Sequence, residues 1–331
     1  MSRKSKFELI PALPDERWDE FVEASPQGTI FSLSRYLEAL ERDSECFYVM
    51  RGQEVKAALC YTPCPDEAGC ELDDLAIHNG IMFKNDETKK ETKARFERFE
   101  ITEFIINELD GRMKRIELAL APQFEDLRPF LWHNYHSKDP HLKFETDLRY
   151  TSYLDISELA SGGDDEATTV FRNMDTIRQR NIREAGKGGA WVEKGGDSGQ
   201  FIAFYQPLLT SQGGDVSKGK LGRMAKLIDV LIESDLGLVL TTRNPAGEPI
   251  YVTVFCHDSK RAYYLFGAGD PVATERYKGT FGFWEGFKLL AQDRGLRTVD
   301  MEGVNSPQRG WFKLSFGGDL RPYYQVYKGN R

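Results

Sequence analysis

The sequence has few cysteines, no long apolar run and no excess of basic residues. Its five cysteines are an odd number spread over 331 residues, so they predict reduced thiols and not a disulfide framework. No segment approaches the ~20 consecutive apolar residues that a transmembrane helix needs. The N-terminal stretch MSRKSKFELIPALPDERW also lacks the apolar run of a secretory signal. We therefore expect a cytoplasmic protein without integral membrane contact.

Two further absences narrow the function. The net charge of −8 and the pI of about 5.4 argue against whole-surface binding to DNA, although they leave a local basic groove open. Cys60, Cys64, Cys70 and His78 lack the paired CxxC spacing of structural zinc, and Cys60 lies in an apolar run typical of a buried thiol. We expect no metal site. The chain also has no repeat or low-complexity signal that would indicate a structural protein.

The length predicts two domains, because a single hydrophobic core rarely grows to this size. We expect an α/β (α+β) chain with an N-terminal domain over 1–155 and a C-terminal domain over 156–331. Residues 89–111 have apolar positions at helical spacing, and residues 237–269 contain three apolar runs separated by turn residues. The first pattern predicts a helix and the second an antiparallel meander.

Four stretches carry a family resemblance: SPQGTIFSLSRYLEAL, IRQRNIREAGKGGAWV, YYLFGAGDP and FGFWEGFKLLAQDRGLRTVDMEGVNSPQRGWFKLSFGGDLRPYY. Together they resemble the FemAB family of peptidoglycan-bridge aminoacyltransferases and its bacterial GNAT-fold relatives. The resemblance implies two tandem GNAT-like domains, each a mixed, largely antiparallel sheet flanked by helices. It also implies transfer of an acyl or aminoacyl group to a primary amine in cell-wall or related biosynthesis. The chain lacks a heptad arm and is similar to the compact members.

The resemblance also implies partners and site residues. The donor would be aminoacyl-tRNA or acyl-CoA, the acceptor a small or nucleotide-linked amine, and no tightly bound cofactor is expected. Lys313 matches the lysine of the family's FKxxFG motif, which stabilises charge at the transferred carbonyl or on the acceptor. The matching substrate-binding positions are Phe312, Asn305 of the G-x-N turn, Arg178, Arg180 and Arg183 of the basic helix, and Arg35 and Tyr36, where Tyr36 replaces the usual Trp.

The chemistry of these residue types leaves alternatives open. Lys313 lies among Trp311, Phe312 and Phe316, so it is either an oxyanion or phosphate ligand or a lysine whose stem covers aromatic surface. Asp300 and Glu302 alternate along one strand and share a face, so each can raise the proton affinity of the other, as a general base for an ammonium would need. They could instead cap the turn at Gly303 or pair with an arginine, and the substrate's own groups could move the proton.

Two glycines remain, Gly267 and Gly269, at the end of a strand before a helix. Backbone amides at such a turn can hold a pyrophosphate or an acyl carbonyl, but the glycines could equally be ordinary turn residues. No Gln or Arg begins the acyl-CoA pattern, so CoA is possible but not indicated. A non-catalytic GNAT-like ligand-binding or scaffold module is the alternative function.

Overall fold

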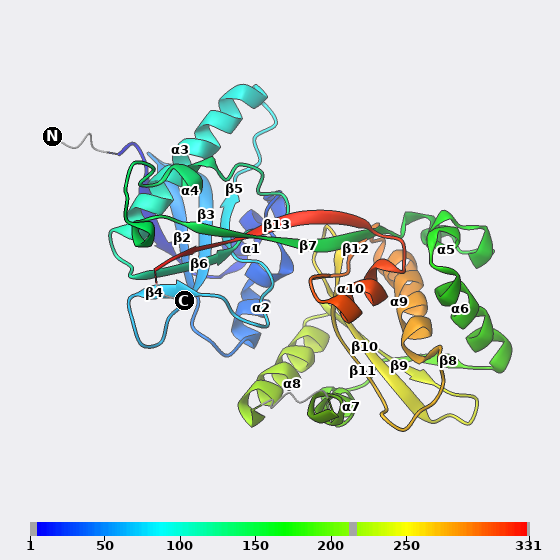
Figure 1. The fold of residues 1–331 in the computed structure, drawn as a ribbon. Helices are drawn as coiled ribbons and strands as arrows, with labels where there is room; N and C mark the ends of the chain where they lie inside the picture. The colour runs from blue at the N-terminus through cyan, green and yellow to red at the C-terminus, as the bar shows by residue number, and fades with distance from the viewer. Residues whose placement is uncertain (1–4, 212–216, 330–331) are drawn as a thin grey trace. The chain divides into compact units, whose positions relative to one another are not determined.

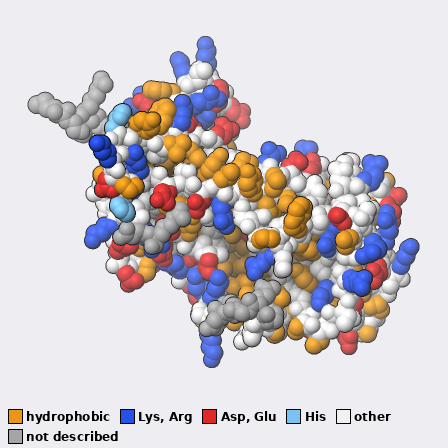
Figure 2. All heavy atoms as spheres, in the orientation of Figure 1, with side chains coloured by type: hydrophobic (Ala, Val, Ile, Leu, Met, Phe, Trp, Pro, Cys, Tyr) orange, Lys and Arg blue, Asp and Glu red, His pale blue; other side chains and the backbone are white. Residues whose placement is uncertain are grey.

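Residues 5–211 and 217–329 are described by the computed structural model of the protein, and they fall into two compact units (Figure 1). The first unit contains Met1–Arg149 and Pro322–Arg331, and the second contains Tyr150–Arg321. The chain therefore passes between the units twice, and its C-terminal segment belongs to the first unit. Charged side chains of both signs are spread over the visible surface (Figure 2).

The first unit is built around a mixed sheet in the strand order β1-β2-β3-β4-β6-β13, with β5 also paired to β3. Only β4 and β6 run parallel, and the other pairs in this unit are antiparallel. The bounds are β1 Glu8–Ala12, α1 Glu16–Ala24, α2 Ser34–Ala39, β2 Glu45–Arg51, β3 Glu54–Pro63, β4 Gly69–Glu71, β5 Gly80–Phe83, α3 Glu91–Asp110, β6 Arg115–Ala119, α4 Arg128–Trp132 and β13 Asp319–Lys328.

Helix α3 confirms the helix predicted over 89–111. Ile101, Ile105 and Leu109 repeat at i, i+4 and i+8, and all three are buried in the core of the first unit. Phe96 is 64% exposed, so it lies off this apolar face. The helix ends at Gly111, whose N–H donates to the Asn107 carbonyl.

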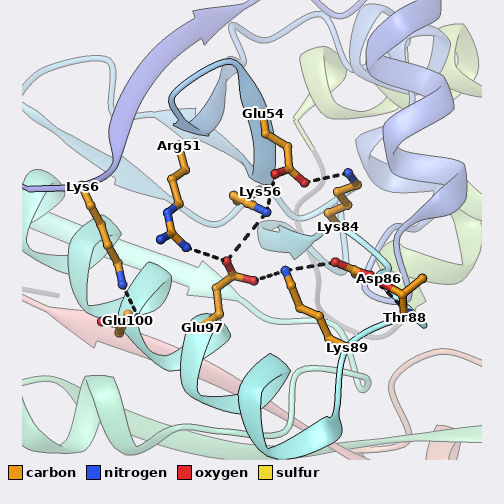
Figure 3. Close-up of polar contacts among 10 residues, drawn as sticks. All are labelled: Lys6, Arg51, Glu54, Lys56, Lys84, Asp86, Thr88, Lys89, Glu97 and Glu100. Atoms are coloured by element: carbon orange, nitrogen blue, oxygen red, sulfur yellow. Dashed lines mark hydrogen bonds and ion pairs between the residues drawn. The ribbon is translucent and has the colours of Figure 1, made fainter.

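An ion-pair network joins α3 to the β2–β3 hairpin (Figure 3). The Glu97 carboxylate lies 2.6 Å from Lys89 Nζ, 3.5 Å from Arg51 and 3.8 Å from Lys56 Nζ. Lys56 is nearly buried and also lies 2.6 Å from Glu54. Glu97 thus contacts one cation on β2, one on β3 and one just before α3. These contacts couple the N-terminal half of α3 to the hairpin.

The second unit has the strand order β7-β12-β11-β10-β9-β8, in which only β11 and β12 run parallel. The bounds are β7 Glu145–Asp155, α5 Thr169–Asn173, α6 Thr176–Gly188, β8 Trp191–Lys194, α7 Ser198–Ser211, α8 Lys218–Glu233, β9 Gly237–Arg243, β10 Pro249–His257, β11 Ala262–Gly269, α9 Lys278–Arg294, β12 Thr298–Asp300 and α10 Pro307–Leu314. Strands β9, β10 and β11 confirm the predicted meander.

Helix α9 covers one face of this meander, and α7 with α8 covers the other (Figure 1). The close approach of α9 to the sheet depends on Gly282. An added Cβ at this position would lie 2.7 Å from Thr242 Oγ1 and 2.8 Å from Thr253 Oγ1. The core between α9 and the sheet includes Phe283 and Phe287, both fully buried. This packing fixes α9 against the strands that carry the candidate site.

The predicted fold class is therefore confirmed: each unit is a mixed, largely antiparallel sheet with helices packed on it. Cys60 is 2% exposed, which confirms its expected burial, and its Sγ lies 3.6 Å from that of Cys46. Across the described ranges, no three His, Cys, Asp or Glu residues lie close enough to hold a metal ion. Over the same ranges, no helix combines the length and apolarity needed to cross a bilayer.

Candidate active site

Strands β11 and β12 pair only through the first two residues of β11 and the last two residues of β12, and then separate. Ala262 lies opposite Val299 and Tyr263 opposite Asp300, where β12 ends, while β11 continues to Gly269. After Asp300 the chain stays beside β7, its antiparallel partner, and the Met301 N–H donates to the Ser152 carbonyl. A parallel pair that stops early leaves the edge of β11 open to other groups.

Strand β11 is also irregular beside this opening. Val254 of β10 lies opposite Phe266, but the next residue, Phe255, lies opposite Tyr264. Leu265 is therefore an extra residue, which makes a β-bulge. Bulges re-aim the neighbouring side chains and occur frequently next to active sites.

Two buried carboxylates lie at the end of β12: Asp300 is its last residue, whereas Glu302 lies beyond the strand on which both were predicted. Asp300 is 1% exposed and Glu302 is 5% exposed. Asp300 Oδ1 accepts from Thr151 Oγ1 and, at 2.8 Å, from the Glu302 N–H, so the predicted turn-capping alternative is realised in part. Asp300 Oδ2 and Glu302 Oε1 are buried without a hydrogen-bond partner. Both atoms therefore have bonding capacity left for a proton or a ligand.

The backbone at Glu302 is unusual as well. Its φ is +54°, in the left-handed region that a side-chain-bearing residue seldom adopts. Such conformations cost about 1–3 kcal/mol and cluster at functional sites. The strain therefore marks Glu302 as a residue whose orientation is held by its surroundings.

Lys313 lies on α10, and its ammonium is close enough to this carboxylate pair for the acids to affect its charge. Its Nζ donates to the Gly303 carbonyl at 3.2 Å and lies 5.1 Å from the centre of the Tyr264 ring. The helix separates the neighbours that surround Lys313 in the sequence: Phe316 is fully buried, whereas Trp311 is 75% exposed. Lys313 is therefore a half-buried cation above an aromatic ring, beside two acids.

Burial controls the charge of all three groups. It raises the pKa of Asp300 to about 6 and raises the pKa of Glu302 well above its usual range, against the attraction of the Lys313 ammonium. Burial also lowers the pKa of Lys313, and the charge of Glu302 opposes that shift. The raised pKa values mean that both carboxyl groups bind a proton more tightly than usual, which is a property that a general base needs.

Arg178 on α6 is a second preorganised cation. Its Nε donates to Ser315 Oγ at 2.9 Å and its Nη1 donates to Thr280 Oγ1 at 2.6 Å, while its guanidinium lies 4.7 Å from the centre of the Phe312 ring. Within the part of the chain that the structure describes, it forms no ion pair with a carboxylate. A half-buried arginine held by two neutral hydroxyls retains its charge for an anionic group.

Aromatic rings connect the two cations. The centre of Phe312 lies 5.3 Å from that of Phe283, which lies 4.4 Å from that of Tyr264. The structure thus brings Lys313, Phe312 and Arg178 together. The sequence did not identify Tyr264 as a site residue, because only the glycines of the segment YYLFGAGDP fit a binding pattern.

The predicted glycines have a packing role. A Cβ on Gly267 would lie 2.5 Å from Tyr264 Oη and 2.6 Å from Tyr251 Oη, and one on Gly269 would lie 3.0 Å from Tyr251 Cδ2. Lys278 Nζ donates to the Asp270 and Ala273 carbonyls at 2.8 Å each and fills the turn that follows β11. Both glycines are therefore explained by contact with the tyrosines beneath them.

Other predicted residues of the second unit are engaged elsewhere. Arg183 forms a two-point ion pair with Glu166, with Nη2 to Oε2 at 2.7 Å, and Arg180 is exposed. The Asn305 side chain pairs with the Tyr150 backbone, accepting its N–H at 2.8 Å and donating to its carbonyl at 2.9 Å. Of the three arginines on α6, only Arg178 contacts the residues around Lys313.

Arg35 and Tyr36 belong to the first unit. Tyr36 is fully buried, and its hydroxyl donates to the Leu75 carbonyl at 2.6 Å. Arg35 is exposed and pairs with Glu38 at 3.0 Å. It lines a groove of about 970 Å³ that is bordered by carboxylates of α1: Glu16, Asp19, Glu20 and Glu23. These carboxylates would repel a phosphate at Arg35.

Each unit has its own mixed sheet, β11 separates early from β12, and helices pack across the meander. Together these features define a tandem GNAT fold. No family model and no curated protein sequence matches the chain. The crystal structure of FemX is similar, with a TM-score of 0.67 and 13% identity, covering 96% of each chain. The resemblance found in the sequence is thereby confirmed at the level of the fold.

Two further solved structures share this architecture. A tandem GNAT protein from the clavulanic acid biosynthesis pathway has a TM-score of 0.53 and 10% identity, covering 97% of each chain. L-PGS from Bacillus licheniformis has a TM-score of 0.52 and 13% identity, covering 96% of this chain and 93% of its own. At these identities the likeness defines the fold, and function has to be argued from the site.

Proposed function

We propose that the protein is an acyltransferase that moves an acyl or aminoacyl group onto a primary amine of a small or nucleotide-linked acceptor. The observation that carries the proposal is the arrangement of Lys313 beside Glu302 and Asp300 at the split between β11 and β12. Acyl transfer to an amine needs a positive group near the carbonyl oxygen and a base near the amine. The fold shared with FemX supports the same reaction class.

In the proposed mechanism, the acceptor nitrogen attacks the carbonyl carbon of the donor ester or thioester. The Lys313 ammonium stabilises the negative charge that develops on the carbonyl oxygen, because a partly desolvated cation acts more strongly than one in water. Glu302, supported by Asp300, accepts a proton from the acceptor nitrogen. The carbon–oxygen or carbon–sulfur bond to the leaving group then breaks, and the leaving alcohol or thiol takes the proton.

Arg178 would bind an anionic part of the substrate. Its charge has no carboxylate counterion in the described ranges, and its orientation is fixed by Ser315, Thr280 and the Phe312 ring. A phosphate or carboxylate of the acceptor fits this environment. A cell-envelope precursor, such as a peptidoglycan-type intermediate linked to a nucleotide, combines such an anion with a primary amine.

The donor is proposed to be aminoacyl-tRNA or acyl-CoA, with no tightly bound cofactor. In the turn after β11, the N–H of Asp270 already donates to the Ile250 carbonyl, and the N–H groups of Val272 and Ala273 donate to Asp270, which leaves fewer backbone amides there for a pyrophosphate. Calorimetric titration with acetyl-CoA and free CoA separates the two donors. Saturable binding would identify an acyl-CoA enzyme, and its absence would direct the assay to charged tRNA.

Substitution of Lys313 tests the proposal directly. We expect Lys313→Ala to lower kcat by about 100-fold or more, since loss of one oxyanion ligand typically costs that much. Lys194→Ala, which removes an exposed lysine of the same unit, is the matched control and should leave kcat unchanged. Substrate affinity that persists with no turnover in any variant, wild type included, would instead support a non-catalytic binding or scaffold module.

A further inference from the structure

The two oxygens of the Asp300 carboxyl group have different surroundings. Oδ1 accepts two hydrogen bonds, one from Thr151 Oγ1 and one from the Glu302 N–H at 2.8 Å. Oδ2 is buried and has no hydrogen-bond partner within the part of the chain that the structure describes. Because a carboxyl oxygen accepts about two hydrogen bonds, Oδ1 is fully used by the protein, whereas Oδ2 can still bind a proton.

Thr151 reaches Asp300 across the antiparallel pair of β7 and β12. Asp300 lies opposite Tyr153, and Thr151 precedes Tyr153 by two residues, so Thr151 and Asp300 share a face of the sheet. Thr151 is fully buried. A β-branched side chain also has few rotamers, so the direction of its hydroxyl is fixed by the strand. The sheet therefore holds a hydrogen-bond donor in place beside Oδ1.

The same oxygen also holds the turn that carries Glu302. The N–H that donates to Oδ1 belongs to the residue whose φ is +54°. Without the Thr151 hydroxyl, Oδ1 would lose one of its two donors. Rotation about χ2 of an aspartate is soft, so either carboxyl oxygen could then turn toward the Glu302 N–H. Thr151 therefore decides which oxygen of Asp300 supports the turn and which one stays available.

We propose that Thr151 is a positioning residue of the acyl-transfer site: its hydroxyl keeps Oδ1 of Asp300 bound to the protein, so that Oδ2 is the oxygen that binds and releases the proton. The inference rests on the proposed function, in which these carboxylates handle the proton of the acceptor amine. The hydrogen bond also acts against burial. Burial raises the pKa of Asp300, and the bonds from Thr151 and from the Glu302 N–H lower it.

Several other titratable or charged groups surround Asp300. They are Tyr153 on β7, Cys256 and Asp258 at the end of β10, Arg261 and Tyr263 at the start of β11, Glu302 after β12 and Lys313 on α10. The charges of Arg261 and Lys313 favour the carboxylate form of Asp300. Glu302 changes its own charge as its raised pKa is crossed. A test of Thr151 therefore has to isolate Asp300 from these groups.

The test uses the full-length protein and needs no substrate. Urea denaturation from about pH 4 to about pH 8 compares wild type with Thr151→Val, which keeps the shape of the side chain and removes its hydroxyl. A hydrogen bond to a carboxylate is stronger than one to a neutral acid, so its loss should raise the pKa of Asp300 by about one pH unit. Stability then continues to fall up to a higher pH, and the destabilisation by Thr151→Val grows as pH rises.

Three variants serve as controls. Thr151→Ser keeps the hydroxyl and should retain the pH dependence of wild type, even if its stability is lower at every pH. Thr253→Val makes the same chemical change at a fully buried threonine of β10, whose hydroxyl has no hydrogen-bond partner among the described residues. Its effect should be the same at every pH. Thr151→Val combined with Asp300→Asn should also have a pH-independent effect relative to Asp300→Asn alone, because the amide does not ionise.

Two results would overturn the inference. They are a destabilisation by Thr151→Val that is constant over the pH range, and one that depends on pH equally when Asp300 is replaced by asparagine. Failure of the proposed function is separable from both. A pH-dependent effect of Thr151→Val in a protein without Lys313-dependent transfer would leave the Thr151–Asp300 coupling standing and remove the acyl-transfer reaction. Lys313-dependent transfer with a pH-independent effect of Thr151→Val would do the reverse.

Where transfer is measured, the acidic limb of kcat/KM against pH gives a second readout. It should move to higher pH in Thr151→Val by about the same amount as the pKa of Asp300, and it should return to its original position in Thr151→Ser. An acidic limb that stays in place while the stability profile moves would mean that Oδ2 of Asp300 does not handle the proton, which would overturn the assigned role.

Discussion

At the scale of single residues, the site combines groups whose neighbours change their chemistry. Lys313, Glu302 and Asp300 would be ordinary charged residues on a surface. Here burial favours the neutral form of each, while the attraction between the Lys313 ammonium and the two carboxylates favours the charged forms. The result is a raised proton affinity of both carboxylates, which the proposed reaction uses.

This balance predicts a pH dependence of stability. Burial raises the pKa of Asp300 to about 6, above its unfolded value of about 3.9. The folded state therefore binds more protons than the unfolded state between these values, and the free energy of unfolding falls as pH rises through this window, by about 1.4 kcal/mol per unit of pKa shift.

Asp300→Asn should flatten that fall, because the amide keeps the Oδ1 acceptor for Thr151 and the Glu302 N–H but does not ionise. Urea denaturation of wild type and variant, at pH values on both sides of the window, measures this change in the free energy of unfolding. An equally steep fall in the variant would mean that Asp300 is not the group responsible. Asp165→Asn, at a partly exposed aspartate of the same unit, is the control.

At the scale of elements, α3 is held in two different ways. Polar contacts order its N-terminal half, and apolar packing orders its C-terminal half. Ile101, Ile105 and Leu109 bury the C-terminal half, whereas Glu97 connects the N-terminal half to Arg51, Lys56 and Lys89 (Figure 3). A partly buried carboxylate with three cations leaves buried charge behind when it is removed.

We therefore expect Glu97→Gln to lower the free energy of unfolding by about 1–3 kcal/mol. Glu91→Gln is the matched control on the same helix, since Glu91 is 62% exposed and its pair with Arg98 is a surface contact. It should change stability much less. Chemical denaturation at low salt compares the two, and equal effects would show that the network has no special contribution.

At the scale of the whole molecule, the two units exchange chain segments. β7 begins in the first unit and ends in the second, and β13 begins in the second and ends in the first. Residues Gln325–Lys328 pair with β6, and Val326 is fully buried in the core of the first unit. The first unit is thus incomplete without the C-terminus.

This exchange predicts the effect of a truncation. A chain ending at Arg321 should lose protection from hydrogen exchange mainly in the first unit, because β6 loses its antiparallel partner and the core loses Val326. A chain ending at Lys328 retains the pairing and should behave like the intact protein. Loss of protection confined to the second unit would contradict the assigned exchange.

The sequence by itself determined the elements and the fold class. The helix over Glu91–Asp110 and the meander of β9, β10 and β11 follow from local periodicity, which depends only on neighbouring residues. The motif resemblance also identified the tandem GNAT fold and the segment around Lys313. The roles of the site residues remain predictions that the proposed substitutions test.

Only the tertiary structure decided which candidates come together. Arg178, Arg180 and Arg183 look equivalent in the sequence, but contacts with Ser315, more than a hundred residues away, select Arg178. Thr151 and Tyr264 carry no local signal, and they join the site through β7 and β11. Burial, the left-handed turn at Glu302 and the exchange of β13 likewise depend on long-range packing, which no local pattern encodes.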